Sequence, residues 1–418
     1  MLHRLVRTHW RTFQNDLLLE DHALPGFVSA EMEAYLRCGI LAHGFVNVRC
    51  GVCCETRPVA FSCKKRGFCP SCMGRRMSKT AAHLVENVFP DVKVRQWVLT
   101  VPHELRFRMA RSPELCSAVL RIFVRCVGNW YRRRAGKCGL RGNLKTGGMT
   151  VIQRFGSALA LNVHFHTVMM DGVYRVDGAR APRFVRVPAP SDRDVVAVSV
   201  DVHKRVTELL ADWDSEGDDV GRDNTAIKAD DREGREHLLR YIARPPLSDE
   251  RLSQMEDGRV AVRLKKAWRD GTTHVAFTPE EFMEKLAALV PRPRANLVRY
   301  HGVFAPAAGD RRRIVPKGAS SGARATDEEA DGCCPGAHPS LRKQRWAELM
   351  KRVFKVDVLE CPRCQNRMTI VATVLKADAI MKILSHRGLE TTAPMIHPAR
   401  PPPTQEVFWD SDPGDWAA

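Results

Sequence analysis

The spacing of the cysteines constrains this chain more than any other feature. Cys50 and Cys53 form one CxxC pair, and Cys69 and Cys72 form a second pair, with 15 residues between the two pairs. Each pair can turn on a tight knuckle, and the intervening hairpin can bring four thiolates around one tetrahedral zinc ion. The alternative is a set of buried free thiols. We therefore predict an N-terminal zinc-ribbon-like domain with structural Zn²⁺ bound by these four cysteines.

Several other potential ligands have no obvious partner in the sequence. Cys38, Cys63 and His43 can make a second site, replace a ligand or belong to the core, and we favour the core for each. Cys361 and Cys364 form a third CxxC pair near the C-terminus, which offers half of a further zinc site. The other half can come from another chain, or from Cys333, Cys334 or His386. A knuckle without metal is the alternative for this pair.

The positive charge of the chain is concentrated in its first part. The net charge is +18, and the first 150 residues carry 25 Lys and Arg against 10 Asp and Glu. Such a field favours nucleic acid, whose phosphates supply most non-specific affinity. Acidic lipid is the alternative polyanion, but the sequence shows no basic amphipathic helix with aromatic anchors that would bind it. Basic residues run through the cysteine cluster, and we expect these to contact DNA: Arg49, Lys64, Lys65, Arg66, Arg75 and Arg76.

The order of patterns along the chain predicts an α+β protein. Alternating apolar segments and helical segments are interspersed from about residue 93 to 306, which is typical of one α+β domain. We predict a zinc-binding DNA-recognition domain over residues 1–88 and a central domain over residues 89–306. A Pro/Gly-rich linker over residues 307–340 then leads to a small CxxC unit over residues 341–387 and a disordered tail over residues 388–418. The chain has neither a signal peptide nor an apolar run long enough to span a membrane, so we expect a soluble cytoplasmic protein.

Two histidines share one face of a predicted strand. The segment LALNVHFHTVMM alternates, so Asn162, His164 and His166 face one way and Phe165 faces the other. Two imidazoles on an otherwise buried strand are costly unless something binds them, and a divalent cation suits neutral imidazole. A pair of hydrogen-bonded core histidines is the alternative.

Tyr241 lies near the end of a predicted helix that the following prolines terminate. His237 one turn before it and Arg244 after it lie along the same side. A phenol between an imidazole and a guanidinium can act as a nucleophile toward a phosphate, with Arg244 as a DNA contact. A surface tyrosine that packs on its own helix is the alternative.

Taken together, these motifs resemble transposases of the insertion sequence 91 family, which are rolling-circle transposases of the HUH type. The resemblance spans most of the chain from Tyr35 to Arg387. It is carried by YLRCGILAHGF, VRCGVCC, FSCKKRGFCPSCMGRRM, WVLTVPHELR, VIQRFGSALALNVHFHTVMMDGVY, LLRYIARPPLS, VRYHGVFAP and VDVLECPRCQNRM.

The resemblance implies an antiparallel-sheet HUH endonuclease core flanked by helices. It implies that His164 and His166 hold a catalytic Mg²⁺ or Mn²⁺. It further implies that Tyr241 cuts one DNA strand and keeps the 5′-phosphate, and that the cysteine domain recognises element ends. The expected partner is single-stranded DNA, in a bacterial cytoplasm and at the nucleoid during the reaction. No phosphate-binding GK[ST] loop occurs, which agrees with a reaction independent of ATP.

One position departs from the family pattern. Two-tyrosine members carry a second tyrosine four residues before the equivalent of Tyr241, where this chain has His237. The chain therefore resembles the single-tyrosine common-region branch, and His237 or Gln153 becomes a candidate third metal ligand, with Glu236 a weaker one. Other classes remain: a plasmid replication initiator or relaxase, a non-catalytic zinc-ribbon DNA-binding protein, and a metal-independent tyrosine recombinase.

Overall fold

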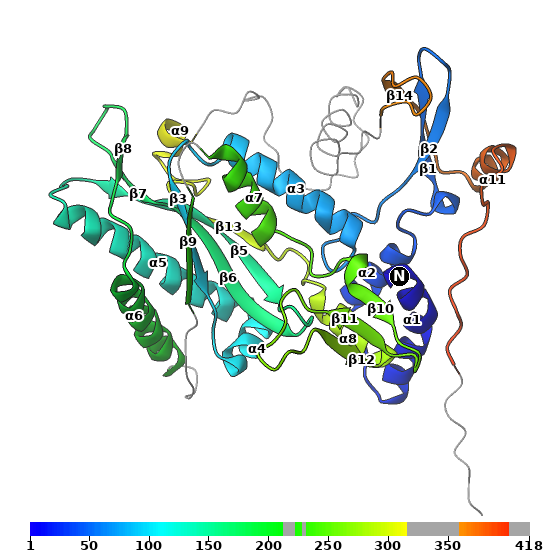
Figure 1. Cartoon of the computed structure of the whole chain (residues 1–418), viewed down its shortest axis with the longest axis horizontal. Coiled ribbons are helices and arrows are strands. Elements are labelled where there is room, and N and C mark those ends of the chain that lie inside the picture. The colour runs from blue at the N-terminus through cyan, green and yellow to red at the C-terminus, as the bar shows by residue number, and fades with distance from the viewer. Residues whose placement is uncertain (212–221, 228–230, 316–358, 401–418) are drawn as a thin grey trace, which may run out of the picture.

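A five-stranded antiparallel sheet forms the centre of the molecule (Figure 1). This computed structural model describes residues 1–211, 222–227, 231–315 and 359–400, so most of the predicted linker lies outside the described residues. The strand order is β13-β5-β6-β3-β9, and every neighbouring pair is antiparallel. These strands are β13 (Val298–Gly302), β5 (Gly147–Phe155), β6 (Leu161–Met170), β3 (Val94–Leu99) and β9 (Arg222–Ile227).

Helices cover both faces of this sheet. One face packs against α4 (His103–Arg111), α5 (Pro113–Lys137) and α6 (Asp192–Ala211) through Phe165 and its neighbours. The other packs against α3 (Pro70–Asn87), α7 (Arg232–Ile242) and α9 (Arg311–Ile314) through Val168 and its neighbours. The predicted α+β class with an antiparallel sheet between helices is confirmed. A small sheet extends beyond its edge, made of β4 (Leu144–Lys145), β7 (Gly172–Arg175) and β8 (Arg183–Arg186).

A second core joins the first residues of the chain to residues near 250–290. The helices α1 (Leu2–Leu19) and α2 (Gly26–Leu36) pack with α8 (Pro279–Leu289) and a three-stranded sheet. That sheet contains β10 (Leu252–Gln254), β11 (Val260–Arg263) and β12 (His274–Phe277), after the short η2 (Asp249–Arg251). A capping box begins α8, in which Thr278 accepts from the Glu281 backbone and Glu281 accepts from the Thr278 backbone. This core therefore crosses the predicted boundary at residue 88.

A separate three-stranded sheet, which we call the arm, joins both ends of the chain. Its order is β14-β1-β2, with β1 (Phe45–Cys50), β2 (Thr56–Ala60) and β14 (Met368–Val374), and it projects from the body in Figure 1. The short η1 (Leu41–His43) and α11 (Ala377–His386) lie at its base. Residues 359–386 thus complete a sheet begun by residues 45–60, where the sequence predicts a separate C-terminal unit.

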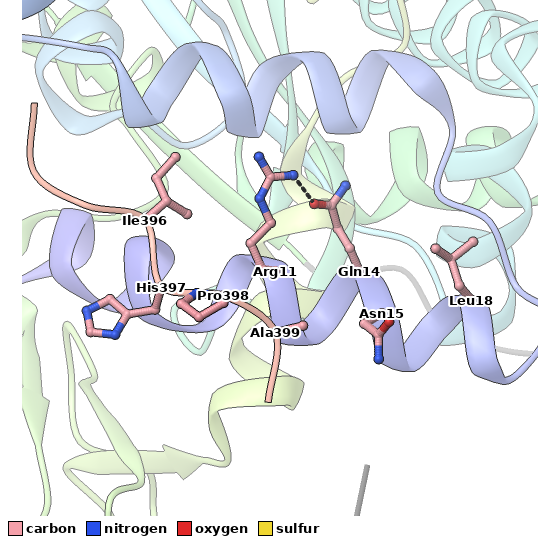
Figure 2. A pocket seen from close by; sticks show the side chains of 8 residues that line it. All are labelled: Arg11, Gln14, Asn15, Leu18, Ile396, His397, Pro398 and Ala399. Atoms are coloured by element: carbon pink, nitrogen blue, oxygen red, sulfur yellow. Dashed lines mark hydrogen bonds between the residues drawn. The ribbon is translucent and has the colours of Figure 1, made fainter. Parts of the chain in front are cut away.

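The described part of the predicted disordered tail packs on the first helix. The His397 backbone donates to the Arg7 carbonyl over 3.1 Å, and the Arg400 backbone donates to Thr12 Oγ1 over 3.1 Å. Figure 2 shows Ile396–Ala399 passing beside α1, where Arg11 donates to Gln14. Residues 396–400 therefore pack along α1, and residues 401–418 lie outside the described residues. In the described part of the chain, no helix is both long and apolar enough to cross a bilayer.

Candidate functional site

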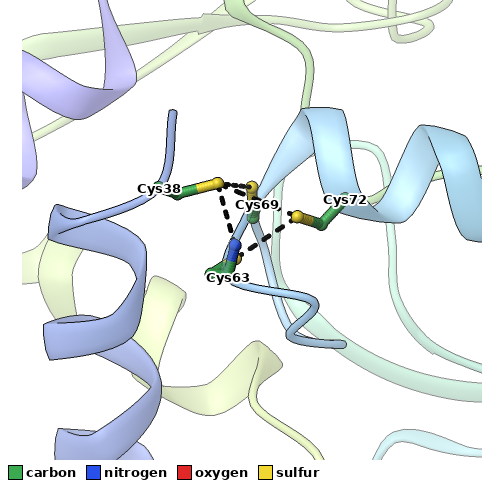
Figure 3. Close-up of side chains that lie close together, drawn as sticks. All are labelled: Cys38, Cys63, Cys69 and Cys72. Carbon is green, nitrogen blue, oxygen red and sulfur yellow. Dashed lines mark hydrogen bonds between the residues drawn. The ribbon is translucent and has the colours of Figure 1, made fainter. Parts of the chain in front are cut away.

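Four cysteines from the N-terminal region meet at the start of α3 (Figure 3). Cys38 follows α2, Cys63 lies in a loop, Cys69 caps α3 and Cys72 lies in its first turn. The Cys38 sulfur is 3.8 Å from those of Cys69 and Cys72, and the Cys63 sulfur is 3.4 Å from that of Cys72. A tetrahedral zinc ion with bonds of roughly 2.3 Å requires sulfurs about 3.8 Å apart. We call this group the first cysteine site.

Hydrogen bonding among the four sulfurs of the first cysteine site shifts their pKa values in both directions, and it raises those of Cys63 and Cys69. Contacts from Cys38 and Cys63 lower the pKa of the Cys72 thiol well below its usual range. Hydrogen bonding to Cys63 lowers the pKa of Cys38 to about 7. Four sulfurs within 4.8 Å of one another, two of them with a lowered pKa, fit structural Zn²⁺.

The predicted grouping of the cysteine pairs is wrong. The structure separates Cys50 and Cys53 from the first cysteine site and places them against Cys361 and Cys364. The reason is the arm: β1 carries its pair away from α3, and pairing with β14 brings the C-terminal cysteines alongside. We call this group the second cysteine site.

The outcomes for the remaining potential ligands also differ from the expectation. Cys38 and Cys63 complete the first cysteine site, although the core was favoured for both. His43 is exposed and belongs to neither group, and His386 ends α11 outside both. Cys333 and Cys334 lie outside the described residues. No local spacing signals Cys38 or Cys63 as ligands, since neither belongs to a CxxC pair.

The two histidines lie side by side on β6, as the alternation predicts. Their ring centroids are 4.9 Å apart, and both rings lie on the sheet face that carries Val168 and packs on α3 and α7. Burial lowers the pKa of both, that of His166 to about 3, so both rings are neutral near pH 7. Neutral imidazole is the form that binds a cation.

Hydrogen bonds orient both rings through the same nitrogen. His164 Nδ1 donates to the Asn162 carbonyl over 2.8 Å, which leaves Nε2 for a ligand. The Gln96 amide nitrogen lies 3.4 Å from His166 Nδ1, while the buried Gln96 oxygen has no partner among the described residues. With the amide turned by 180°, that oxygen accepts the Nδ1 proton of His166. Both histidines then present Nε2, the arrangement that outer partners commonly impose on metal-binding histidines.

The proposed third ligands differ in position. Gln153 lies directly opposite His164 on β5, and its amide nitrogen donates to the Ile242 carbonyl over 2.5 Å, so its oxygen is the atom that can bind a cation. His237 is exposed on α7. Among the described residues, it forms no metal-binding group with His164 and His166. Glu236 is buried and accepts from Arg240 over 3.0 Å.

Tyr241 stands at the end of α7, over the histidine pair. Its ring centroid is 6.3 Å from that of His166, and the rings are perpendicular. Its side chain is 46% exposed, so a nucleic acid can reach it. The Arg244 guanidinium stacks on the ring at 4.2 Å. By contrast, Tyr174 is buried, and burial raises its pKa to about 12.

Apolar and ionic contacts fix α7 on the sheet. Leu238, Leu239 and Ile242 are buried in the core on the α3 side. At the other end of the helix, Asp231 caps it by accepting from the Gly234 backbone. Arg235 donates to the Pro90 carbonyl over 3.0 Å and to Asp91 over 2.8 Å. The tyrosine therefore sits on a rigid platform.

The basic residues expected at DNA do not form one patch. Arg49 is exposed on the arm, whereas Lys64 and Arg76 are exposed around the first cysteine site. Arg66 instead donates to the Ala295 carbonyl over 2.9 Å. Lys65 and Arg75 are half-buried.

Two family models match the chain. Residues 5–101 match a transposase zinc-binding domain, and residues 147–312 match a putative transposase domain. No curated protein and no solved structure is significantly similar to the chain. The first match contains the first cysteine site, and the second contains His164, His166 and Tyr241. These two matches define the class of protein as a zinc-binding transposase, an enzyme that acts on DNA. More particularly, the two matches in this order identify the chain as a transposase of the insertion sequence 91 family.

Proposed function

We propose that this transposase is a single-tyrosine HUH strand transferase that nicks one DNA strand at an element end and drives rolling-circle transposition. The observation that carries the proposal is the position of the exposed Tyr241 over the neutral histidine pair. The ring centroid of Tyr241 lies 6.3 Å from that of His166. A phenol beside a cation site is the pair of groups that nucleophilic attack on a phosphodiester requires.

The residues divide the work as follows. His164, His166 and the Gln153 oxygen would hold Mg²⁺ or Mn²⁺, which supplies Lewis-acid polarisation of the scissile phosphate when bound. Tyr241 Oη attacks phosphorus, the bond to the 3′-oxygen breaks, and the 3′-oxygen takes up a proton as the phenol loses one. Arg244 stacks on the Tyr241 ring and offers its guanidinium to a phosphate beside it.

The product is a 5′-phosphotyrosine and a free 3′-OH. The ester keeps the phosphodiester energy, so attack by a 3′-OH reseals a strand without ATP. Because the chain carries one tyrosine at this position, with His237 in place of a second, a single covalent link forms for each chain in each round. The zinc-binding domain would recognise the element end, and single-stranded DNA is the proposed substrate.

The decisive experiment looks for the covalent adduct. Single-stranded oligonucleotides from the flanks of the gene are incubated with the protein and Mn²⁺ and resolved on a denaturing gel. We expect an adduct with wild type, none with Tyr241→Phe, and none after EDTA or with the His164→Ala/His166→Ala double variant. Tyr174→Phe is the matched control and should retain the adduct.

Mass spectrometry of the wild-type adduct should place the nucleotide on Tyr241. An adduct that persists in Tyr241→Phe would refute this choice of nucleophile. If wild type forms no adduct with either flank while all variants still bind DNA, the result would instead support a non-catalytic DNA-binding protein. Cutting at a plasmid origin and not at the flanks would support a replication initiator.

A further inference from the structure

The second cysteine site has the geometry of a tetrahedral metal site. The Cys53 sulfur lies 3.4 Å from those of Cys361 and Cys364, and the Cys50 sulfur lies 3.5 Å from that of Cys364. All four sulfurs lie within 4.8 Å of one another. Cys50 and Cys361 are fully buried, whereas Cys53 and Cys364 are partly exposed. Four mutually close sulfurs suit a shared cation better than two separate disulfides.

The two halves of this site share one backbone conformation, although 308 residues separate Cys53 from Cys361. In each half, the residue after the second cysteine is left-handed: φ is 56° at Cys54 and 60° at Gln365. In each half, the first cysteine's N–H donates to the carbonyl five residues later, over 2.7 Å for Cys50 and 2.9 Å for Cys361. Left-handed residues other than glycine are uncommon. The same turn at both pairs points to one ligand held between two equivalent knuckles.

Two small apolar clusters hold the arm, and the one at its base contains Phe45, Val374, Ile380 and Leu384. The other, around the second cysteine site, contains only three buried residues besides Cys50 and Cys361 among the residues the structure describes: Val48, Leu359 and Met368. So small a core supplies little hydrophobic stabilisation, and natural domains of this kind depend on metals or disulfides. A metal bound beside the pairing of β1 with β14, which sets Cys50 opposite Met368, would therefore reinforce it.

We propose that Cys50, Cys53, Cys361 and Cys364 bind a second zinc ion, which ties residues 359–400 to the N-terminal domain. Cys361 and Cys364 lie outside both family matches, which cover residues 5–101 and 147–312. This site does not involve His164, His166 or Tyr241, and the proposal stands whether or not the chain nicks DNA.

Metal content tests the site itself. The wild-type full chain should hold two zinc ions, and Cys361→Ser/Cys364→Ser should hold one. Cys54→Ser is the matched control, because Cys54 adjoins Cys53, is exposed and belongs to neither group; it should keep two. Cys364→His should also keep two, since imidazole replaces a thiolate, and its cobalt-substituted form should lose part of the sulfur-to-cobalt absorption. One zinc ion in wild type, or two in the double serine variant, would overturn the proposal.

A cleavable chain tests the tie. A protease site is inserted between residues 330 and 331, and the cut protein is run on gel filtration. The C-terminal fragment should stay with the N-terminal fragment in wild type and separate in Cys361→Ser/Cys364→Ser. A fragment that separates from wild type, or one that remains bound in the variant, would contradict the tie. A dimer that the double substitution converts to monomers would place the two pairs on different chains and refute an intramolecular link.

Discussion

Among single residues, the sequence gives no sign that the Gln96 amide contacts His166. It comes from β3, next to β6 in the sheet, and it is 3% exposed. Its oxygen has no partner in the described structure as placed, and turning the amide gives that oxygen the Nδ1 proton of His166. We infer that Gln96 is a positioning residue that fixes the His166 tautomer. Outer partners of this kind raise metal affinity without touching the metal.

Gln96→Leu tests this role. Leucine is similar in volume to glutamine but lacks the hydrogen-bond acceptor, so the fold should persist. The Mn²⁺ concentration needed for nicking should rise roughly 10- to 100-fold. Gln96→Glu keeps an acceptor and should stay close to wild type. The measurement is the Mn²⁺ dependence of adduct formation, with thermal melting as the check on folding. Equal Mn²⁺ dependence for wild type and Gln96→Leu would show that the amide does not position the ring.

At the scale of elements, α3 connects the first cysteine site to Tyr241, the proposed nucleophile. Its first turn contains Cys72 and follows Cys69, and its later turns contribute Leu84 and Val85 to the core that holds α7. Figure 1 shows α3 and α7 side by side over the central sheet. A loss of order at the start of α3 should therefore weaken the packing of α3 on α7, the helix that carries Tyr241.

Cys69→Ser should make this connection visible. Because a structural zinc site contributes its binding energy to folding, the variant should lose one zinc ion per chain and melt several degrees lower. Adduct formation should fall as well, although residue 69 is not part of the proposed catalytic site. Cys138→Ser, an exposed cysteine outside both groups, is the control. Full zinc content and an unchanged melting temperature in Cys69→Ser would contradict a structural role.

Local patterns predicted the elements better than they predicted their partners. Alternation along 161–170 correctly placed both histidines on one face, and the prolines after Tyr241 correctly ended its helix. The grouping of cysteines failed because two CxxC pairs 15 residues apart look the same whether they share a metal or not. The deciding contact is the pairing of β1 with β14, across more than 300 residues, and no short-range spacing encodes it.

On the scale of the whole molecule, the predicted boundary at residue 88 does not separate two folding units. Leu2, Val6 and Trp10 of α1 are buried in a core with Phe282 and Leu286 of α8. The zinc-binding domain that the family model outlines is therefore completed by residues far beyond it. The arm likewise needs β14 from the C-terminal region.

A fragment of residues 1–88 should accordingly fail to form a native core. It exposes the apolar side chains of α1 and α2 that α8 covers in the full chain, so it should bind a hydrophobic dye and elute as aggregates. The measurement compares dye fluorescence and gel filtration of this fragment with the full chain. A monomeric fragment with one cooperative unfolding transition would refute the shared core.

The same core has a consequence for synthesis on the ribosome. The partners of α1 on α8 are translated more than 250 residues after α1 itself. At roughly 5–20 residues per second, its apolar face waits on the order of 10 to 60 s for them. During this interval the nascent chain presents an unprotected amphipathic helix to chaperones and to its neighbours on the polysome. The helix α1 thus reaches its native contacts on α8 long after it has been made.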